Sequence, residues 1–184
     1  MSSYNKKLPI EVSLEYPLYE SKKGNYFIGQ TPTLKSSTNK VLVELKNPIN
    51  SNKEIYLNAI TITNISSLNL SSEFYLGSSF NDGLTSKLVS CTNTAIFPEP
   101  IPKGKIKYLD NANKPPTNGV PIFSRIVAPY STLVIDGGQI ILDSGKSIII
   151  YIGGFLYSSF DGIKIAFGWY EEEFYRESTN FQKC

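Results

Sequence analysis

Residues 131–152, with the sequence STLVIDGGQIILDSGKSIIIYI, carry the strongest evidence for the fold class. Ile, Val and Leu dominate this stretch, and two polar turns, Asp136-Gly-Gly138 and Asp143-Ser-Gly145, interrupt it. Short runs of β-branched residues bounded by Asp, Gly and Ser are typical of strands connected by tight turns. We therefore predict three strands, at residues 131–135, 139–142 and 147–152, joined as two hairpins.

The same pattern of short apolar strands extends outward from this stretch. Residues 41–45, 54–63, 122–127 and 163–170 are runs rich in Ile, Val, Leu and aromatic residues. Residues 70–76 alternate apolar and polar side chains with the period of two that indicates a half-buried strand. No segment carries a helical period long enough for a βαβ unit. The pattern thus predicts an all-β protein, an antiparallel two-sheet β-sandwich of jelly-roll type.

Composition and charge limit the class of protein. A chain of 184 residues fits one domain, which hides roughly 70% of the surface that the unfolded chain exposes. The 18 basic and 16 acidic residues are scattered and give a net charge of +2, which predicts no nucleic-acid partner. No apolar run approaches the ~20 residues of a membrane-spanning helix, and the N-terminus lacks the apolar core of a secretory signal. We expect synthesis in the cytoplasm without a signal peptide, and no membrane span.

The chain divides into three predicted parts. Residues 1–39 are rich in Tyr, Lys, Ser and Asn and are broken by Pro9, Pro17 and Pro32, which predicts an extended N-terminal arm with at most one or two strands. Residues 40–175 form the predicted jelly-roll β-sandwich, and residues 176–184 a C-terminal tail that ends in Cys. If the arm lies outside the core, a protein that lacks residues 1–38 should still be a folded monomer.

The sequence offers little for catalysis. It contains no histidine, which excludes Ser-His-acid and Cys-His nucleophile systems and any His-liganded metal site. Glu171-Glu-Glu173, with Asp143 and Asp161, are candidates for a pair of catalytic carboxylates. Neighbouring residues on a strand point to opposite faces, so we interpret the three glutamates as a solvated strand end. We therefore predict no enzyme, no cofactor and no metal site.

The two cysteines are the candidate site residues. Cys184 is the last residue of the sequence, and Cys91 follows a short predicted strand at residues 87–89. A Cys at a chain end is poorly placed to staple its own fold and well placed to reach another molecule. Outside the cytoplasm, Cys91 of one subunit and Cys184 of the next are candidates for an intersubunit disulfide. Two reduced thiols, or a bridge within one chain, are the alternatives.

Aromatic residues suggest a second kind of function. They make up 12% of the chain, with 12 Tyr, 10 Phe and one Trp. Rings on an exposed sheet face can stack on sugars, but core and interface packing use the same residues. Carbohydrate binding is therefore an alternative function.

Three segments resemble a known family: SRIVAPYSTLV at residues 124–134, IAFGWYEE at residues 165–172 and VLVELKNP at residues 41–48. They are similar to small, uncharacterised jelly-roll-like β proteins of spore-forming Firmicutes, over roughly residues 40–173. In plan the chain also resembles the subunits of endospore appendages, which are pilus-like fibres. That resemblance implies a jelly roll, a flexible N-terminal connector without a secretory signal, and Cys residues that cross-link neighbours. The arm here has no Cys, which leaves Cys184 as the substitute.

These observations predict a self-assembling structural subunit of an extracellular or spore-surface fibre or layer. The subunits would join by strand addition and by the Cys91–Cys184 disulfide, because an arm or open edge strand offers unpaired backbone groups. The main partner is then the protein itself, and a spore-surface anchor protein or a glycan would be a further one. The alternative is a carbohydrate-binding or adhesin-type surface module.

Overall fold

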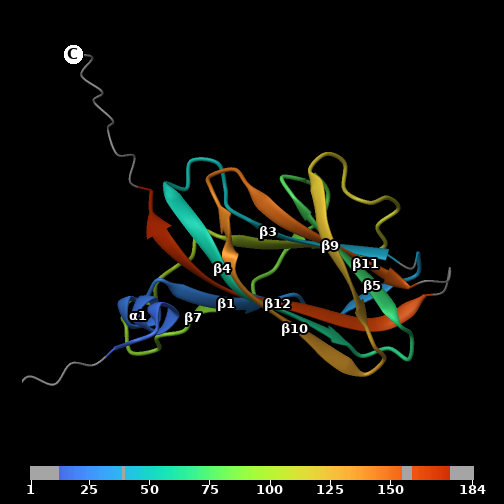
Figure 1. Ribbon diagram of the computed structural model, residues 1–184, viewed down its shortest axis with the longest axis horizontal. Coiled ribbons are helices and arrows are strands. Elements are labelled where there is room, and N and C mark those ends of the chain that lie inside the picture. Colours follow the sequence, from blue (N-terminus) through green and yellow to red (C-terminus); the bar gives the residue numbers. More distant parts are fainter. Residues whose placement is uncertain (1–12, 39, 155–158, 175–184) are drawn as a thin grey trace, which may run out of the picture.

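The structure is a computed structural model that describes residues 13–38, 40–154 and 159–174. In these ranges, helix α1 (Tyr16–Lys23) accompanies two antiparallel sheets that face each other, as Figure 1 shows. The predicted all-β sandwich is therefore confirmed. None of the helices in the described ranges has the length and apolar character needed to cross a membrane.

Each sheet contains six strands in the described part of the chain. Sheet A has the order β10 (Ser131–Leu142), β4 (Lys53–Asn64), β12 (Phe160–Glu173), β1 (Tyr26–Gln30) and β7 (Val89–Cys91), with β2 (Leu34–Ser36) also beside β12. Sheet B has the order β6 (Leu84–Thr85), β8 (Lys105–Leu109), β3 (Lys40–Lys46), β11 (Ser147–Gly154), β5 (Leu70–Leu76) and β9 (Val120–Val127).

The strand order is that of a jelly roll. With β1 and β2 counted as one broken strand, sheet A contains β1/β2, β12, β4 and β10, and sheet B contains β3, β11, β5 and β9. Along the chain these strands cross between the sheets at every step except from β5 to β9, which lie side by side. This order is the double Greek key of jelly rolls. Strands β6, β7 and β8 come from the segment between β5 and β9, and they extend the two sheets beside β1 and β3.

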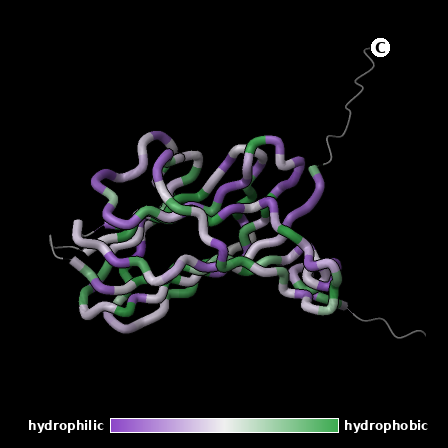
Figure 2. The backbone as a smooth tube through the Cα atoms, turned by 180° about the vertical axis from the view of Figure 1, so that it is seen from behind, coloured by the Kyte–Doolittle hydropathy of each residue, from purple (hydrophilic) through white to green (hydrophobic). Residues whose placement is uncertain are grey.

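The core lies between the sheets and consists mainly of Ile, Val and Leu, with Trp169, Phe74 and Phe167 as its largest buried side chains. Figure 2 shows hydrophobic stretches along the strands and hydrophilic ones in many of the connections. A smaller cluster that includes Leu42 and Ile149 lies on the outer face of sheet B. Because both of its faces are covered, β11 is buried at every residue, which explains its unbroken apolar sequence.

The first of the two predicted hairpins is wrong. Asp136-Gly-Gly138 lies inside β10, which continues as one strand beside β4. The register shifts there, because Asp136 lies opposite Ala59 while Ile140 lies opposite Leu57. Glycines inside a strand permit such a bulge, and the same residues favour a tight turn. The long neighbouring strand β4 selects the bulge.

The second predicted hairpin is a turn, but it connects the two sheets. Residues 143–145 lead from β10 in sheet A to β11 in sheet B. The backbone N–H of Lys146 donates to the Asp143 carbonyl oxygen at 2.9 Å, and that of Gly145 donates to the Asn47 carbonyl oxygen at 3.0 Å. The local sequence therefore predicted the turn correctly. It could not predict that the two strands flanking this turn pair with other strands, in different sheets.

The segment expected to be an extended arm is largely part of the sandwich. Residues 1–12 lie outside the described residues, and residues 13–38 contain α1, β1 and β2. Pro17 lies in the first turn of α1, and Gly24, with φ of 81°, ends the helix. Strand β1 lies between β12 and β7, and Phe27 and Leu34 belong to the core. The jelly roll therefore begins with β1 and not near residue 40.

Candidate functional site

The long strands β9 and β10 form one edge of the sandwich. β9 is the last strand of sheet B, β10 is the last strand of sheet A, and residues 128–130 connect them. Neither has a strand partner on its outer side within the described ranges. Four exposed apolar side chains lie along them: Val120 (63%), Ile126 (65%), Val134 (58%) and Ile141 (52%). We call these two strands the β9/β10 edge.

Few features protect the β9/β10 edge from pairing with another chain. Proteins usually block open edges with short strands, Lys residues, Pro or inward-pointing charges. β9 carries Pro121 and one charged residue, Arg125, whereas the 12 residues of β10 include a single charge, Asp136, and no Pro. β10 is therefore the more open template for strand addition.

Strand β7 forms the opposite edge of sheet A. The Gln30 N–H donates to the Leu88 carbonyl oxygen at 2.9 Å, and the Thr92 N–H donates to the Tyr26 carbonyl oxygen at 3.0 Å. The backbone N–H and carbonyl groups of successive residues in a strand point to alternate sides, so those of Leu88, Ser90 and Thr92 point toward β1. The backbone groups of Val89 and Cys91 then point outward, away from β1.

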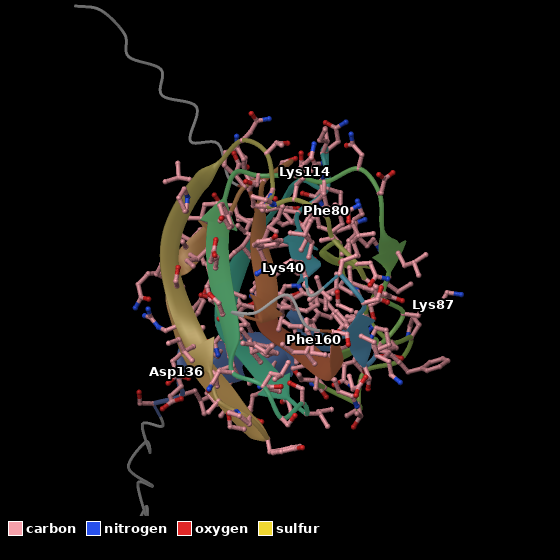
Figure 3. All side chains as sticks on the ribbon, turned by 90° about the vertical axis from the view of Figure 1, so that its right-hand side faces the viewer. Lys40, Phe80, Lys87, Lys114, Asp136 and Phe160 are labelled. Carbon is pink, nitrogen blue, oxygen red and sulfur yellow. The ribbon has the colours of Figure 1, made fainter. Side chains whose placement is uncertain are left out.

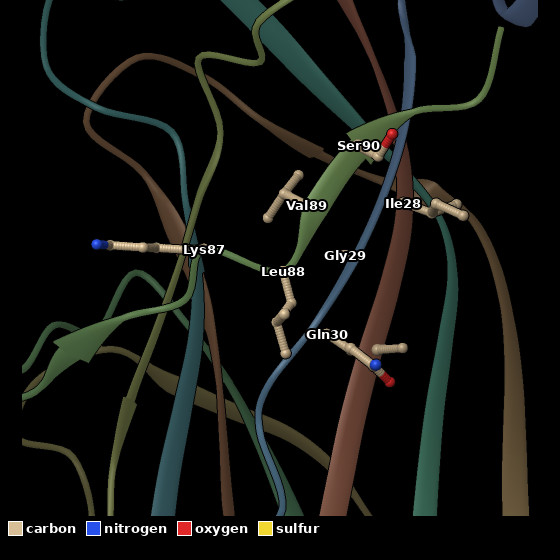
Figure 4. A pocket seen from close by; sticks show the side chains of 8 residues that line it. Ile28, Gly29, Gln30, Lys87, Leu88, Val89 and Ser90 are labelled. Atoms are coloured by element: carbon tan, nitrogen blue, oxygen red, sulfur yellow. The ribbon is translucent and has the colours of Figure 1, made fainter. Parts of the chain in front are cut away.

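Two grooves adjoin β7: the first extends over β1 as far as Ala166 of β12, and the second lies on the outward side of β7. One, of about 540 Å³, is shown in Figure 4 and is lined by Ile28, Gly29, Gln30, Lys87, Leu88, Val89, Ser90 and Ala166. A second, of about 320 Å³, lies between Val89 and Ser90 and the Pro-rich segment from Glu99 to Pro102. Ile101 (83%) and Leu88 (51%) are exposed on their walls. Lys87 points away from the molecule (Figure 3). We call these two grooves together the β7 groove.

A cluster of tyrosines lies on the outer face of sheet A. Tyr56, Tyr170 and Tyr26 are neighbours across β4, β12 and β1. The rings of Tyr56 and Tyr170 stack with centroids 4.8 Å apart and an interplanar angle of 4°, and Tyr26 lies 6.4 Å from Tyr170 at 28°. Tyr16 of α1 contacts the Tyr170 ring edge-on at 5.6 Å. The cluster thus holds α1 on the sheet.

Carboxylates fix the phenol groups of this cluster. Tyr16 donates to Glu172, and this hydrogen bond is the main cause that raises the pKa of Tyr16. Tyr56 donates to Glu54 Oε2 at 2.8 Å, and burial together with this bond raises its pKa. The ring faces of Tyr170 and Tyr56 pack against each other, whereas a sugar needs a free ring face. The cluster is therefore better suited to a structural contact than to glycan stacking.

The interpretation of Glu171-Glu-Glu173 as a solvated strand end is wrong for Glu171. This side chain is 3% exposed. Its Oε2 accepts a hydrogen bond from the backbone N–H of Lys103 at 2.9 Å, and its Oε1 accepts from the Gly104 N–H at 2.8 Å and from Trp169 Nε1 at 3.0 Å. Glu171 thus anchors the connection between β7 and β8 to β12.

Of the other candidate carboxylates, Asp161 lies far from Glu171. The exposed Asp143 follows Leu142, which is two strands, or about 10 Å, from Glu171 in sheet A, whereas the Glu171 carboxylate faces the interior. Asp161 is at the opposite end of β12, ten residues away, which corresponds to about 33 Å in a strand. Paired carboxylates in glycosidases lie within about 10 Å of each other. Asp143 lies in the turn between β10 and β11. Among the described residues, no group of three or more His, Cys, Asp or Glu side chains is placed to hold a metal ion.

Of the two cysteines in the predicted disulfide, Cys91 lies within the described residues and Cys184 does not. Cys91 is 3% exposed on β7, with its Sγ 3.6 Å from the Gly24 carbonyl oxygen, and its thiol is free. Cys184 lies outside the described residues. A bridge from Cys91 to another subunit would require β7 to move, because a buried thiol is inaccessible to an incoming sulfur. The intersubunit disulfide stays a prediction.

Sequence reasoning missed the β7 groove. Its strand has three residues, and the Pro-rich segment beside it has no strand pattern. The apolar residues Phe97 and Ile101, four positions apart among prolines, were the available signal, because exposed apolar side chains that lie in a group can mark an interaction site.

Comparison with known proteins places most of the chain in one family model. The model is described as a family of unknown function (DUF6143), and it matches residues 2–176. The match covers the segment before β1 as well as the sandwich. No curated protein and no solved structure matches the chain.

Proposed function

Because the chain belongs to DUF6143, a family of unknown function, we propose a role from the structure: the protein is a self-assembling structural subunit of a fibre or layer on a spore or cell surface. The protein reaches the surface as the assembly forms. Its main partner is another copy of itself. The resemblance to endospore-appendage subunits supports this proposal only through the shared arrangement of an N-terminal segment, a jelly roll and Cys residues.

The observation that carries the proposal is the uncovered β9/β10 edge. Val134 and Ile141 expose apolar side chains along a 12-residue edge strand, and Ile126 does so on its neighbour. A long apolar edge without blocking charges pairs readily with another chain. The opposite edge of sheet A, at β7, is a different surface. Contacts between unlike surfaces do not close on themselves unless the rotation forms a ring, so they generate filaments.

The experiment is negative-stain electron microscopy of the purified protein, with light scattering over a range of concentrations. The double variant Val134→Lys and Ile141→Lys places two ammonium groups along β10, where they should prevent pairing. The matched control is Ile49→Lys, since Ile49 is 74% exposed and lies in the connection between β3 and β4. Circular dichroism verifies that all three proteins are folded.

We expect filaments or sheets from the wild type and from the control, and the loss of these regular assemblies in the β10 variant. Reducing and non-reducing gels of the same samples test the Cys91–Cys184 bridge separately. Filaments without a ladder of disulfide-linked bands would support self-assembly and would rule out the bridge. A wild type that stays monomeric at every concentration would rule out the proposed function.

The alternative, a carbohydrate-binding or adhesin-type module, has weaker support. The tyrosine cluster on sheet A has stacked ring faces, and the most exposed rings, Phe97 (96%) and Tyr130 (73%), lie in separate connections. Glycan-array binding that disappears in Phe97→Ala or Tyr130→Ala, by a protein that stays monomeric, would favour this alternative.

A further inference from the structure

We propose that the β7 groove binds residues 7–12 of another copy of the chain as an added β-strand. This inference rests on the proposed self-assembly and names the site that receives the incoming segment. It assigns a binding role to β7 and to the Pro-rich segment beside it. Four features support it: the free backbone groups of β7, the walls of the groove, the pattern of residues 7–12 and the position of α1.

Strand β7 offers backbone groups that have no partner among the described residues. Val89 presents its N–H and carbonyl oxygen outward, and Cys91 presents its N–H, while the Cys91 carbonyl oxygen accepts from Ser90 Oγ at 3.0 Å. The segment that faces them contains Pro100 and Pro102, which have no N–H to donate. The wall contacts β7 through the hydrogen bond from Ser90 Oγ to Glu99 Oε1 at 2.9 Å, and no backbone hydrogen bond joins the two among the described residues. The unpaired backbone groups of β7 are therefore available to an extended peptide.

The walls of the groove suit one extended, apolar segment. Ile101 and Leu88 are exposed on them, and Pro100 is part of the second groove. The groove is bounded by a loop on the side away from β1, so it admits a single strand more easily than the edge of a folded sheet. Strand β7 has three residues, and its outward-facing Val89 and Cys91 can pair with two alternate residues of a short incoming strand.

Residues 7–12 have the sequence KLPIEV, in which Leu8, Ile10 and Val12 alternate with other residues. In an added strand, alternate residues direct their N–H toward the partner. Pro9 has no N–H and must belong to the set that faces away from β7. Leu8, Ile10 and Val12 then form the set that pairs with Val89 and Cys91, and their three side chains share one face.

The position of α1 favours a segment from another copy. The described chain starts at Ser13, and Tyr16 at the start of α1 is held over β12 by Tyr170 and Glu172. In sheet A, β12 and β7 are separated by β1, which corresponds to about 10 Å between the two. Residues 13–15 leave little slack for the chain to cross α1 and β1 and enter its own groove. The segment is thus better placed to reach a neighbour.

The test uses two full-length variants with complementary defects. The arm variant, Leu8→Asp with Ile10→Asp, keeps an intact groove, and the groove variant, Leu88→Asp with Ile101→Asp, keeps an intact arm. The arm control, Ser2→Asp with Ser3→Asp, has the same added charge as the arm variant, and Ile49→Asp is a surface control with one added charge. Circular dichroism and thermal melting show whether each protein is folded. Analytical ultracentrifugation measures association of each variant alone and of the mixture.

When Val134→Lys and Ile141→Lys are added to both variants to remove the β9/β10 contact, we expect each variant alone to be monomeric. The mixture should form a one-to-one dimer that grows no further, since only one arm and one groove are functional. Self-association of either variant should be at least 10-fold weaker than that of the controls. A mixture that shows no heterodimer overturns the inference, whether or not the wild type forms filaments.

Two other results separate this inference from the proposed function. Filaments from the arm variant would overturn the arm–groove contact and leave assembly through the β9/β10 edge standing. Hydrogen exchange at the Val89 and Cys91 amides reports the origin of the strand. Protection that depends on protein concentration supports a neighbouring copy. Protection that is equal at every concentration in the wild type and lost in the arm variant shows insertion into the chain's own groove and overturns the proposal.

Discussion

Glu171 shows how a single residue connects distant parts of this chain. Three donors converge on its buried carboxylate, two of them backbone N–H groups of the connection before β8. Replacing it by Ala leaves these donors unpaired in the interior. We expect Glu171→Ala to lower the free energy of unfolding by about 3 kcal/mol, and Glu171→Gln by about 1–2 kcal/mol because one amide oxygen can still accept. Urea denaturation measures both, and equal losses would contradict the hydrogen-bond account.

Glu44 gives a residue-scale prediction of pH dependence. It is fully buried on β3, and burial raises its pKa above the usual value of about 4.5, although Lys46 and Lys107 oppose the shift. The folded state therefore binds the proton more tightly than the unfolded state does. The free energy of unfolding then falls as the pH rises above about 4.5 and through the raised pKa.

Glu44→Gln should remove this dependence, because the amide resembles the protonated acid. The difference in unfolding free energy between variant and wild type should shift in favour of the variant as the pH rises from 4 to 8. The surface variant Glu99→Gln serves as the control. A difference that does not change with pH would contradict the assignment.

At the scale of elements, β1 differs most from expectation, because the sequence predicted an extended arm there and the structure has a strand inside sheet A. Phe27 of β1 and Leu34 of β2 are 3% and 0% exposed in the core. Deleting residues 1–38 should therefore give an unfolded or aggregated protein, not the folded monomer expected from an arm. Deleting residues 1–12 should leave the melting temperature within a few degrees of the wild type. Circular dichroism during heating distinguishes the two, and a cooperative melt of the longer deletion would contradict the structure.

The elements that could be predicted are those with a complete local pattern. Strands β3, β4, β5 and β11 lie within two residues of their predicted limits, because their apolar residues are continuous or alternate strictly. Helix α1 was missed although Pro17, Lys22 and Lys23 fit a helix start and end, since its apolar residues are few. The bulge in β10 and the crossing turn at residues 143–145 depend on the partner strand, which no local pattern contains.

The sequence predicted that the candidate site would be an open strand edge, but not which strand would form it. An uncovered edge strand was expected from the fold class, but which strand would be the edge depends on the order of strands in each sheet. The β7 groove depends on a segment with no strand pattern that folds beside a three-residue strand. Cys91 was named from its position in the sequence, and its burial follows from contacts with β1 and Gly24, which are distant in the chain.

At the scale of the whole molecule, the assembly should depend little on salt. The net charge is +2, and β10 carries one charged residue, so few charges are brought together when edges pair. Contacts between apolar side chains weaken on cooling and are not screened by ions. We expect filaments to persist in 1 M NaCl and to shorten near 4 °C, as measured by light scattering. Dissociation by salt at 25 °C would point to charge pairing instead.

The position of β12 has a consequence for the order of events during synthesis. Of the strands in the described residues, β12 is the last to leave the ribosome, and it lies between β4 and β1, near the middle of sheet A. Until residue 173 has emerged, β1 and β4 have no strand between them, and their apolar sides remain open to other nascent chains. Folding is then slow to begin, because its central pairing joins residues more than 130 positions apart. A cell that makes this protein in quantity must keep the residues before β12 from pairing with neighbouring chains until this strand has emerged.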